Sequence, residues 1–196
     1  MIHPLPDFPP LFPPGKWWRL FLSRILADAS ERAGISFANR ECGLRPREWM
    51  RVRIAGGAML SFPVAGGASA LKNHSSSSWM MARESTREAA RFASTLATVY
   101  GRTPFFLLLR DSFFLEICPG GRAQEICEAG FRNVLDILLP HGSETLRSIS
   151  DELSVPGSRI LNITEESNKN FNPELSIIDA LVRMGPDAIF PLLPTF

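Results

Sequence analysis

The sequence predicts a single α/β domain, in which a small sheet carrying a β-hairpin is covered by several helices. Two observations favour this class. A period-two pattern between residues 50 and 64 is typical of paired strands, and apolar residues recur at helical spacing through most of the chain after residue 84. The length fits one compact domain and no repeat or linker divides it, so we assign 1–196 to one domain. Because the strand patterns cluster early and the helical patterns late, an α+β arrangement is the alternative.

The hairpin is the clearest strand signal. Apolar residues alternate with Arg51 and Arg53, which is the pattern of a strand with one buried face. The pair Gly56-Gly57 supplies the positive φ values that a tight two-residue turn needs. We expect Met59–Val64 to form the return strand.

Helical spacing predicts a short amphipathic helix near the start and four helices after residue 84. Capping boxes, first-turn prolines and glycine–proline stops mark their ends. The expected helices are Lys16–Ile25, one from Ser85 with Glu88 as its capping partner, one from Thr103-Pro104 to Pro119, one over Ile126–Leu138, and one capped by Asn172 that ends at Gly185-Pro186. Two further short strands are expected at Gly34–Asn39 and Ser158–Thr164.

Composition and charge argue against several classes of protein. Lys+Arg 21 against Asp+Glu 20 leaves net +1, so no global field attracts nucleic acid or an anionic membrane. No apolar run approaches the ~20 residues of a membrane span, and the start lacks the features of a secretory signal, so we expect a cytoplasmic protein. Cys42, Cys118 and Cys127 form no C-x-x-C pair, so we expect no disulfide framework, metal site or cofactor.

Four residues are candidates for a functional site. His3 could act as acid, base or phosphate contact, or lie in a flexible terminus. Arg51 and Arg53 lie ~7 Å apart on one strand face. They could grip a diphosphate or carboxylate, or form a solvated face that protects a sheet edge. Tyr100, the single tyrosine of the chain, could contact a ligand or serve ordinary packing.

One further charged pair lies in the last expected helix. Asp179 and Arg183 are four residues apart, which places both side chains on one face of that helix. We expect a solvated ion pair there in preference to an acid/base system.

Four segments, in order along the chain, resemble the WbqC-like family. FNPELSIIDALVRMGPDAIFPLL (Phe171–Leu193) is similar to that family's carboxy-terminal signature, particularly the versions common in Bacteroidetes. VYGRTPFFLLLRD (Val99–Asp111) is similar to its A-Y-x-x-x-P-[YF]-F segment, and RVRIAGGAMLSFPVAGG (Arg51–Gly67) to its hairpin. HPLPDFPP near the start resembles the family's H-Q-P-x-[YF]-[FL]-P-W.

The chain also departs from the family pattern. Pro4 replaces a glutamine, Met50 an asparagine, and Phe92 falls near an expected histidine; a D-[LF]-N motif is replaced around Arg122–Ala129. If those polar residues do chemistry in relatives, this protein is altered in activity or only binds.

The resemblance implies a role in surface-polysaccharide and O-antigen metabolism. The implied chemistry is acyl or aminoacyl transfer to a nucleotide-linked aminosugar, with Arg51 and Arg53 on the pyrophosphate and His3 as acid/base. The alternative is a non-catalytic binding or scaffold protein. A histidine-and-proline loop between a strand and a helix also suggests a Rossmann-like sheet by analogy. Exposed aromatic residues at the start (Trp17 and Trp18) would allow a homodimer.

Overall fold

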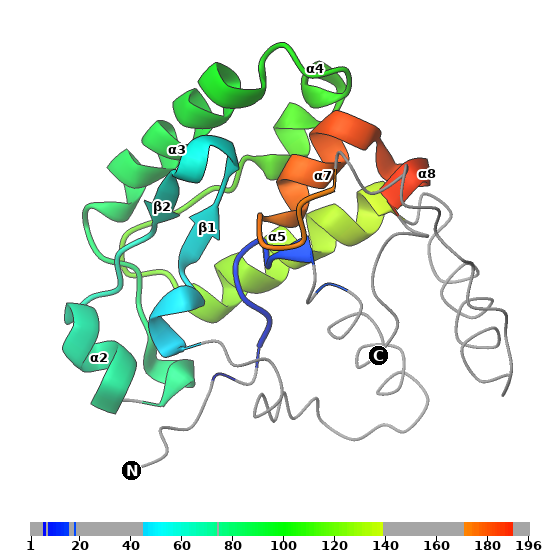
Figure 1. The fold of residues 1–196 in the computed structure, drawn as a ribbon. Helices are drawn as coiled ribbons and strands as arrows, with labels where there is room; N and C mark the ends of the chain where they lie inside the picture. The colour runs from blue at the N-terminus through cyan, green and yellow to red at the C-terminus, as the bar shows by residue number, and fades with distance from the viewer. Residues whose placement is uncertain are drawn as a thin grey trace, which may run out of the picture.

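The computed structural model of the chain describes residues 6, 8–15, 18, 45–73, 75–138 and 171–189. Its elements, with η for 3₁₀ helices, are η2 (Pro46–Glu48), β1 (Arg51–Arg53), η3 (Ala55–Gly57), β2 (Met59–Ser61), α2 (Gly67–Asn73), η4 (Ser76–Ser78), α3 (Ser85–Tyr100), α4 (Phe106–Leu109), η5 (Arg110–Phe113), α5 (Ala123–Leu138), α7 (Ile177–Met184) and α8 (Pro186–Ile189) (Figure 1). The expected helix at Lys16–Ile25, apart from Trp18, and the strands expected at Gly34–Asn39 and Ser158–Thr164 lie outside the described residues.

The architecture mixes helices with one small sheet. Helix α3 packs against β2, α7 contacts α4 and α8, and α5 contacts η4, η5 and α8. The sheet seen in the described part of the chain has two antiparallel strands, which is compatible with the α+β alternative. The larger Rossmann-like sheet is not seen in that part. A membrane-spanning helix is also absent from it, since no described helix combines the necessary length and apolar character.

The hairpin forms where the alternating pattern predicted it. Its paired residues are Arg51 with Ser61, Val52 with Leu60, and Arg53 with Met59. The N–H of Ile54 donates to the carbonyl of Ala58 at 3.0 Å, which leaves a loop of three residues where two were expected. Gly56 and Gly57 both have φ of 77°, as predicted, and that conformation is strained for other residues.

Helix α3 presents the expected apolar stripe, with Phe92 and Leu96 buried and Val99 half-buried. The expected capping box is wrong, however. Glu84 is the N-cap and makes no side-chain capping bond. The buried Ser85 hydroxyl instead donates to the carbonyl of Pro63 at 2.9 Å, which ties the start of the helix to the chain after β2. The local pattern predicted that the Ser85 hydroxyl bonds within the first turn of the helix, but it bonds to a distant carbonyl group instead.

The helix expected from Thr103-Pro104 to Pro119 breaks after one turn. Only the short helices α4 and η5 form, followed by extended chain. The apolar residues here are consecutive, so one continuous helix cannot bury them all on a single face. Leu107 and Leu108 remain 70% and 77% exposed, while Phe113 and Ile117 reach the core.

Helices α5 and α7 confirm the expected apolar stripes, but the cap of α7 differs. Ser176, rather than Asn172, is the N-cap, and its Oγ accepts from the N–H of Ile178 at 3.3 Å. The Asn172 side chain accepts from the N–H of Glu174 and forms a turn ahead of the helix. Gly185 ends α7 with φ of 80°, as its position predicted.

The proline-rich segment 8–15 runs through the core. Its main chain bonds to both neighbours: the N–H of Leu11 donates to Trp49 at 2.8 Å, and the N–H of Ile177 donates to Pro13 at 3.0 Å. The Ser176 hydroxyl donates to Phe12 at 3.0 Å. This segment therefore joins the chain before β1 to the start of α7.

Aromatic rings fill the core around this segment. Phe92 stacks on Phe12 with ring centroids 5.8 Å apart and meets Phe62 edge-on at 5.4 Å. Trp18 packs on Phe131 at 4.2 Å and is fully buried. The expectation that Trp18 is exposed is therefore wrong.

Candidate functional site

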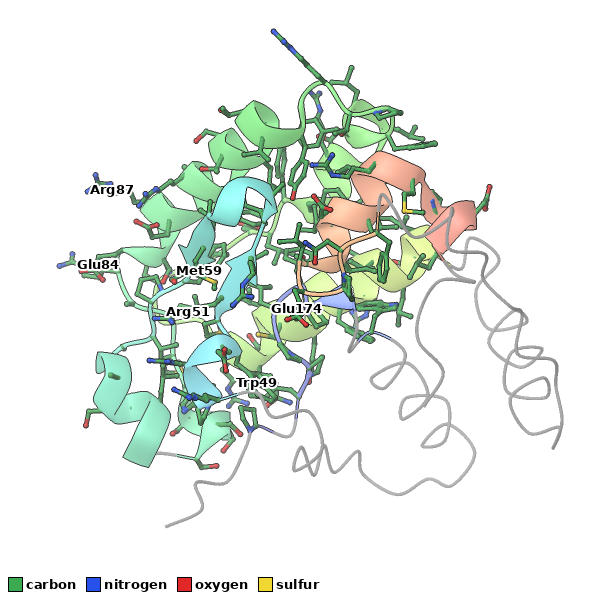
Figure 2. All side chains as sticks on the ribbon, viewed as in Figure 1. Trp49, Arg51, Met59, Glu84, Arg87 and Glu174 are labelled. Carbon is green, nitrogen blue, oxygen red and sulfur yellow. The ribbon has the colours of Figure 1, made fainter. Side chains whose placement is uncertain are left out.

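The two predicted arginines lie on what we call the arginine hairpin, residues 51–61. They alternate along β1 with the fully buried Val52, so both side chains leave the face opposite the core. Arg53 is exposed, and Arg51, which Figure 2 labels, is half-buried. Neither guanidinium forms an ion pair or hydrogen bond with any part of the chain that the structure describes. Within the described residues, no carboxylate competes with an anionic ligand for either charge.

The third predicted residue, Tyr100, meets the same hairpin from behind. It ends helix α3 and is fully buried. Its hydroxyl oxygen accepts a hydrogen bond of 2.9 Å from the N–H of Ala55, in the hairpin loop. Tyr100 consequently contacts the backbone that follows Arg53 and has no exposed surface of its own.

The Asp179–Arg183 pair lies against Tyr100, and it is not solvated as expected. Arg183 Nε donates to Asp179 Oδ1 at 2.9 Å, and the Asp179 side chain is only 4% exposed, against 40% for Arg183. The Arg183 guanidinium carbon lies 5.8 Å from the centre of the Tyr100 ring. The i,i+4 spacing fits both a solvated and a buried pair, so the sequence could not distinguish them.

Burial raises the pKa of the Tyr100 hydroxyl well above its ordinary value. The N–H of Ala55 opposes this shift, whereas the charge of Asp179 and a hydrogen bond to its side chain reinforce it. The hydroxyl therefore stays protonated near neutral pH and can donate to Asp179 while it accepts from Ala55. This arrangement suits a structural group better than an acid or base.

The described cysteines offer no reactive thiol at this site. Cys127 is fully buried, with its Sγ 3.6 Å from Met50 Sδ, and burial raises its pKa. Cys118 is exposed on the turn before α5. Among the residues described, no group of three His, Cys, Asp or Glu side chains is placed to hold a metal ion.

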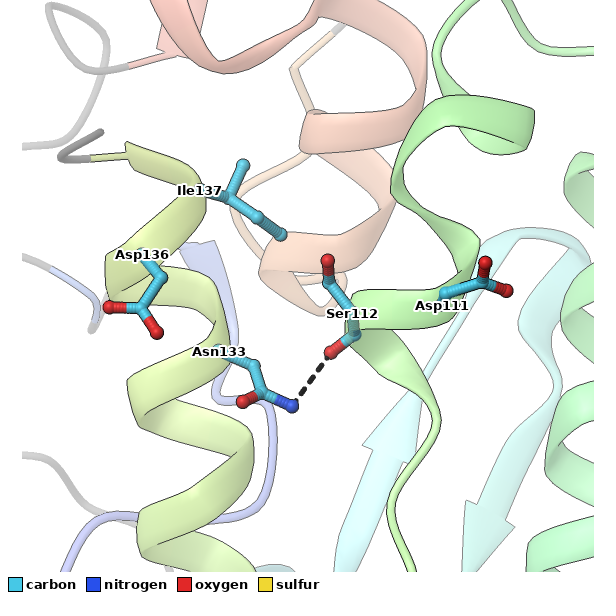
Figure 3. A pocket seen from close by; sticks show the side chains of 5 residues that line it. All are labelled: Asp111, Ser112, Asn133, Asp136 and Ile137. Atoms are coloured by element: carbon cyan, nitrogen blue, oxygen red, sulfur yellow. Dashed lines mark hydrogen bonds between the residues drawn. The ribbon is translucent and has the colours of Figure 1, made fainter.

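A second feature, which the sequence analysis did not single out, is an open depression of about 360 Å³ between η5 and α5 (Figure 3). We call it the acidic depression. Its lining residues are Asp111, Ser112, Asn133, Asp136 and Ile137. The Asn133 amide donates to the Ser112 carbonyl at 2.9 Å, and Asp111 pairs with Arg110 at 3.2 Å. With two carboxylates and no basic side chain in its lining, the depression does not suit a phosphate.

Comparison of the chain with protein-family models, curated proteins and solved structures finds no match. Membership of the WbqC-like family therefore stays a prediction from the sequence, and the functional proposal depends on the geometry of the site.

Three of the four resembling segments come together in space. Ala55 belongs to the hairpin segment, Tyr100 to the segment at 99–111, and Asp179 to the carboxy-terminal one, and the three residues form one connected polar cluster. His3, the fourth candidate, lies outside the described residues. Asp179 was missed as a site residue because its burial depends on contacts far along the chain.

Proposed function

We propose that this protein is a WbqC-like protein that binds a nucleotide-linked aminosugar through the arginine hairpin. Arg51 and Arg53 grip the diphosphate. The observation that carries the proposal is that both guanidinium groups lie on one exposed strand face without a carboxylate partner in the described part of the chain. Guanidinium donors match phosphate oxygens in geometry and charge, so such a face suits a diphosphate.

The proposed reaction is acyl or aminoacyl transfer to the sugar amine. The amine nitrogen attacks the carbonyl carbon of the activated acyl group, forming the amide bond as the bond to the leaving group breaks. His3 accepts the proton that the amine loses and returns it to the leaving group. The sequence predicted that Tyr100 takes part in substrate binding. Because its side chain is buried, it takes part in this proposal by supporting the hairpin backbone.

A second candidate function is binding without turnover. Two positions at which the resembled family carries polar residues are occupied here by buried apolar ones, Met50 and Phe92. Phe92 packs between two other aromatic rings and contributes to the core. A protein that keeps the arginines and loses these polar groups would hold the nucleotide sugar without transforming it.

The remaining expectations belong to the same proposal. We propose a cytoplasmic protein whose complete sheet is Rossmann-like, and a homodimer. An experimental structure of the full chain tests the sheet, and sedimentation equilibrium tests the dimer. A monomer at high micromolar concentration would contradict the dimer.

Isothermal titration with UDP-glucosamine, whose sugar carries a free amine, and with inorganic pyrophosphate tests the main proposal. Arg51→Ala should weaken binding of both by about tenfold or more, since a hydrogen bond to a charged group contributes roughly 1.5–3 kcal/mol. Arg87→Ala is the matched control, because Arg87 lies exposed on α3, away from β1 (Figure 2), and its loss removes the same charge. Equal affinities for wild type and Arg51→Ala would contradict the proposal. Turnover of an aminosugar together with an acyl donor distinguishes the enzyme from the binder.

A further inference from the structure

The start of α7 supports the backbone at the end of β1 on both sides of Ile54. On one side, the N–H of Ser176 donates to the carbonyl of Arg53 at 2.8 Å. On the other side, the N–H of Ala55 donates to the Tyr100 hydroxyl, which interacts with Asp179. Ile54 itself is fully buried. The exit of the strand that carries the arginines is therefore fixed by groups from α7 and the end of α3.

Beyond this point the loop packs against the core through the half-buried Ala55, whereas its two glycines lie in the open. A Cβ placed on Gly56 or Gly57 would meet nothing within 4 Å, so neighbouring groups do not enclose the tip. Within the described chain, the bond from Ala55 to Tyr100 is the hydrogen bond that ties the loop to an element outside the hairpin. The position of the loop consequently depends on this hydrogen bond together with the packing of Ala55 against the core.

Asp179 lies close enough to that hydroxyl for its charge to raise the pKa of Tyr100. A buried carboxylate is costly unless it is paired, and Arg183 supplies the opposite charge at 2.9 Å. When the Tyr100 hydroxyl donates its single hydrogen to Asp179, its lone pairs remain free to accept from Ala55. Arg183 thus pairs with Asp179, the charge of Asp179 acts on the Tyr100 hydroxyl, and that hydroxyl accepts from Ala55.

We infer that Asp179 and Tyr100 are positioning residues for the arginine hairpin, through which anion binding by Arg51 and Arg53 depends on two buried side chains that never contact the ligand. The inference rests on the proposed function. A hairpin held in place before the ligand arrives loses less conformational freedom on binding, and this raises affinity.

The test combines amide hydrogen exchange at Ala55 with titration of inorganic pyrophosphate. Tyr100→Phe keeps the ring and removes the hydroxyl. It should speed exchange of the Ala55 amide about tenfold and weaken pyrophosphate binding about fivefold, as expected for the loss of one hydrogen bond. Adding Asp179→Asn to Tyr100→Phe should weaken binding no further, because Asp179 acts through the hydroxyl.

Ser85→Ala is the matched control, because it removes another buried hydroxyl that bonds to backbone, at Pro63. It should lower the melting temperature and leave pyrophosphate affinity unchanged. Equal losses of affinity in Ser85→Ala and Tyr100→Phe would overturn the inference by showing a general effect of stability. Unchanged binding in Tyr100→Phe would overturn the inference alone. Absence of pyrophosphate binding by the wild type would overturn the proposed function, and the inference with it.

Discussion

The arginine hairpin and the acidic depression both present charged groups to solvent, but they hold those groups in different ways. Behind the hairpin lies a buried chain of polar contacts from Arg183 through Asp179 and Tyr100 to the loop. In the depression, Asp111 is 79% exposed, and its partner among the described residues is the neighbouring Arg110, which is itself half exposed.

The difference separates charged groups whose positions are fixed by buried contacts from charged groups that lie on the surface without such contacts. Surface ion pairs between flexible side chains contribute little and fix little. A buried carboxylate with two partners costs more to form, and it holds its neighbours in one geometry. The difference is the reason that ligand binding is proposed at the hairpin and not at the depression.

The largest expected effect tests whether apolar packing, rather than charge, stabilises the region of the depression. Phe113 in η5 is fully buried and meets Phe12 edge-on, with ring centroids 6.2 Å apart. Phe113→Ala should lower the free energy of unfolding by about 3–5 kcal/mol, measured by urea denaturation. Its neighbour Phe114 is 41% exposed, and Phe114→Ala should cost roughly 1 kcal/mol. Similar losses at the two positions would contradict this account.

A smaller effect compares one carboxylate from each region. Asp179→Ala removes a buried carboxylate and leaves Arg183 without its partner, which should cost about 1–3 kcal/mol. Asp136→Ala removes an exposed carboxylate from the depression and should change stability by less than about 0.5 kcal/mol. Thermal unfolding of both variants measures the difference. If Asp179→Ala were as stable as wild type, the two regions would not differ in the way described.

The smallest expected effect is a loss of folding stability at alkaline pH. The pKa of Tyr100 is raised in the folded protein, so the folded state holds this proton more tightly than the unfolded chain does. The resulting stability is present below the ordinary pKa of 10.0 and is lost as pH rises above it. Between pH 9 and pH 11, wild type should lose about 1 kcal/mol more than Tyr100→Phe in urea denaturation. Parallel losses in the two proteins would show that Tyr100 does not contribute.

Short-range patterns predicted the parts of the fold that depend on short-range forces. Alternation around Arg51 and Arg53 gave the strand, and helical spacing gave the buried faces of α3 and α5. The two predicted caps failed for different reasons: a distant carbonyl group holds the Ser85 hydroxyl, whereas Asn172 accepts locally from Glu174 ahead of the helix. Ser85 bonds to Pro63, and Ser176 gains a second partner in Phe12, which Asn172 lacks.

The candidate site likewise has one part that local patterns predicted and one part that they could not predict. The two arginines could be found from their spacing alone, because both lie on one short strand. The support behind them could not be found, since Ala55 and Tyr100 are 45 residues apart in sequence and Asp179 lies still further along. Burial of Asp179 is decided by the packing of α7 against other elements, and no local pattern records it.

The segment at 8–15 sets the order in which the protein can complete its fold during synthesis. The hydroxyl of Ser176 bonds to Phe12 across 164 residues of chain, and Ile177 bonds to Pro13. A nascent chain leaves the ribosome from its amino end, so Phe12 emerges long before these partners do. The segment must therefore wait until residues 176 and 177 have been translated before it can form these bonds. A segment that leaves the ribosome early is thus among the last parts of the described chain to be fixed in place.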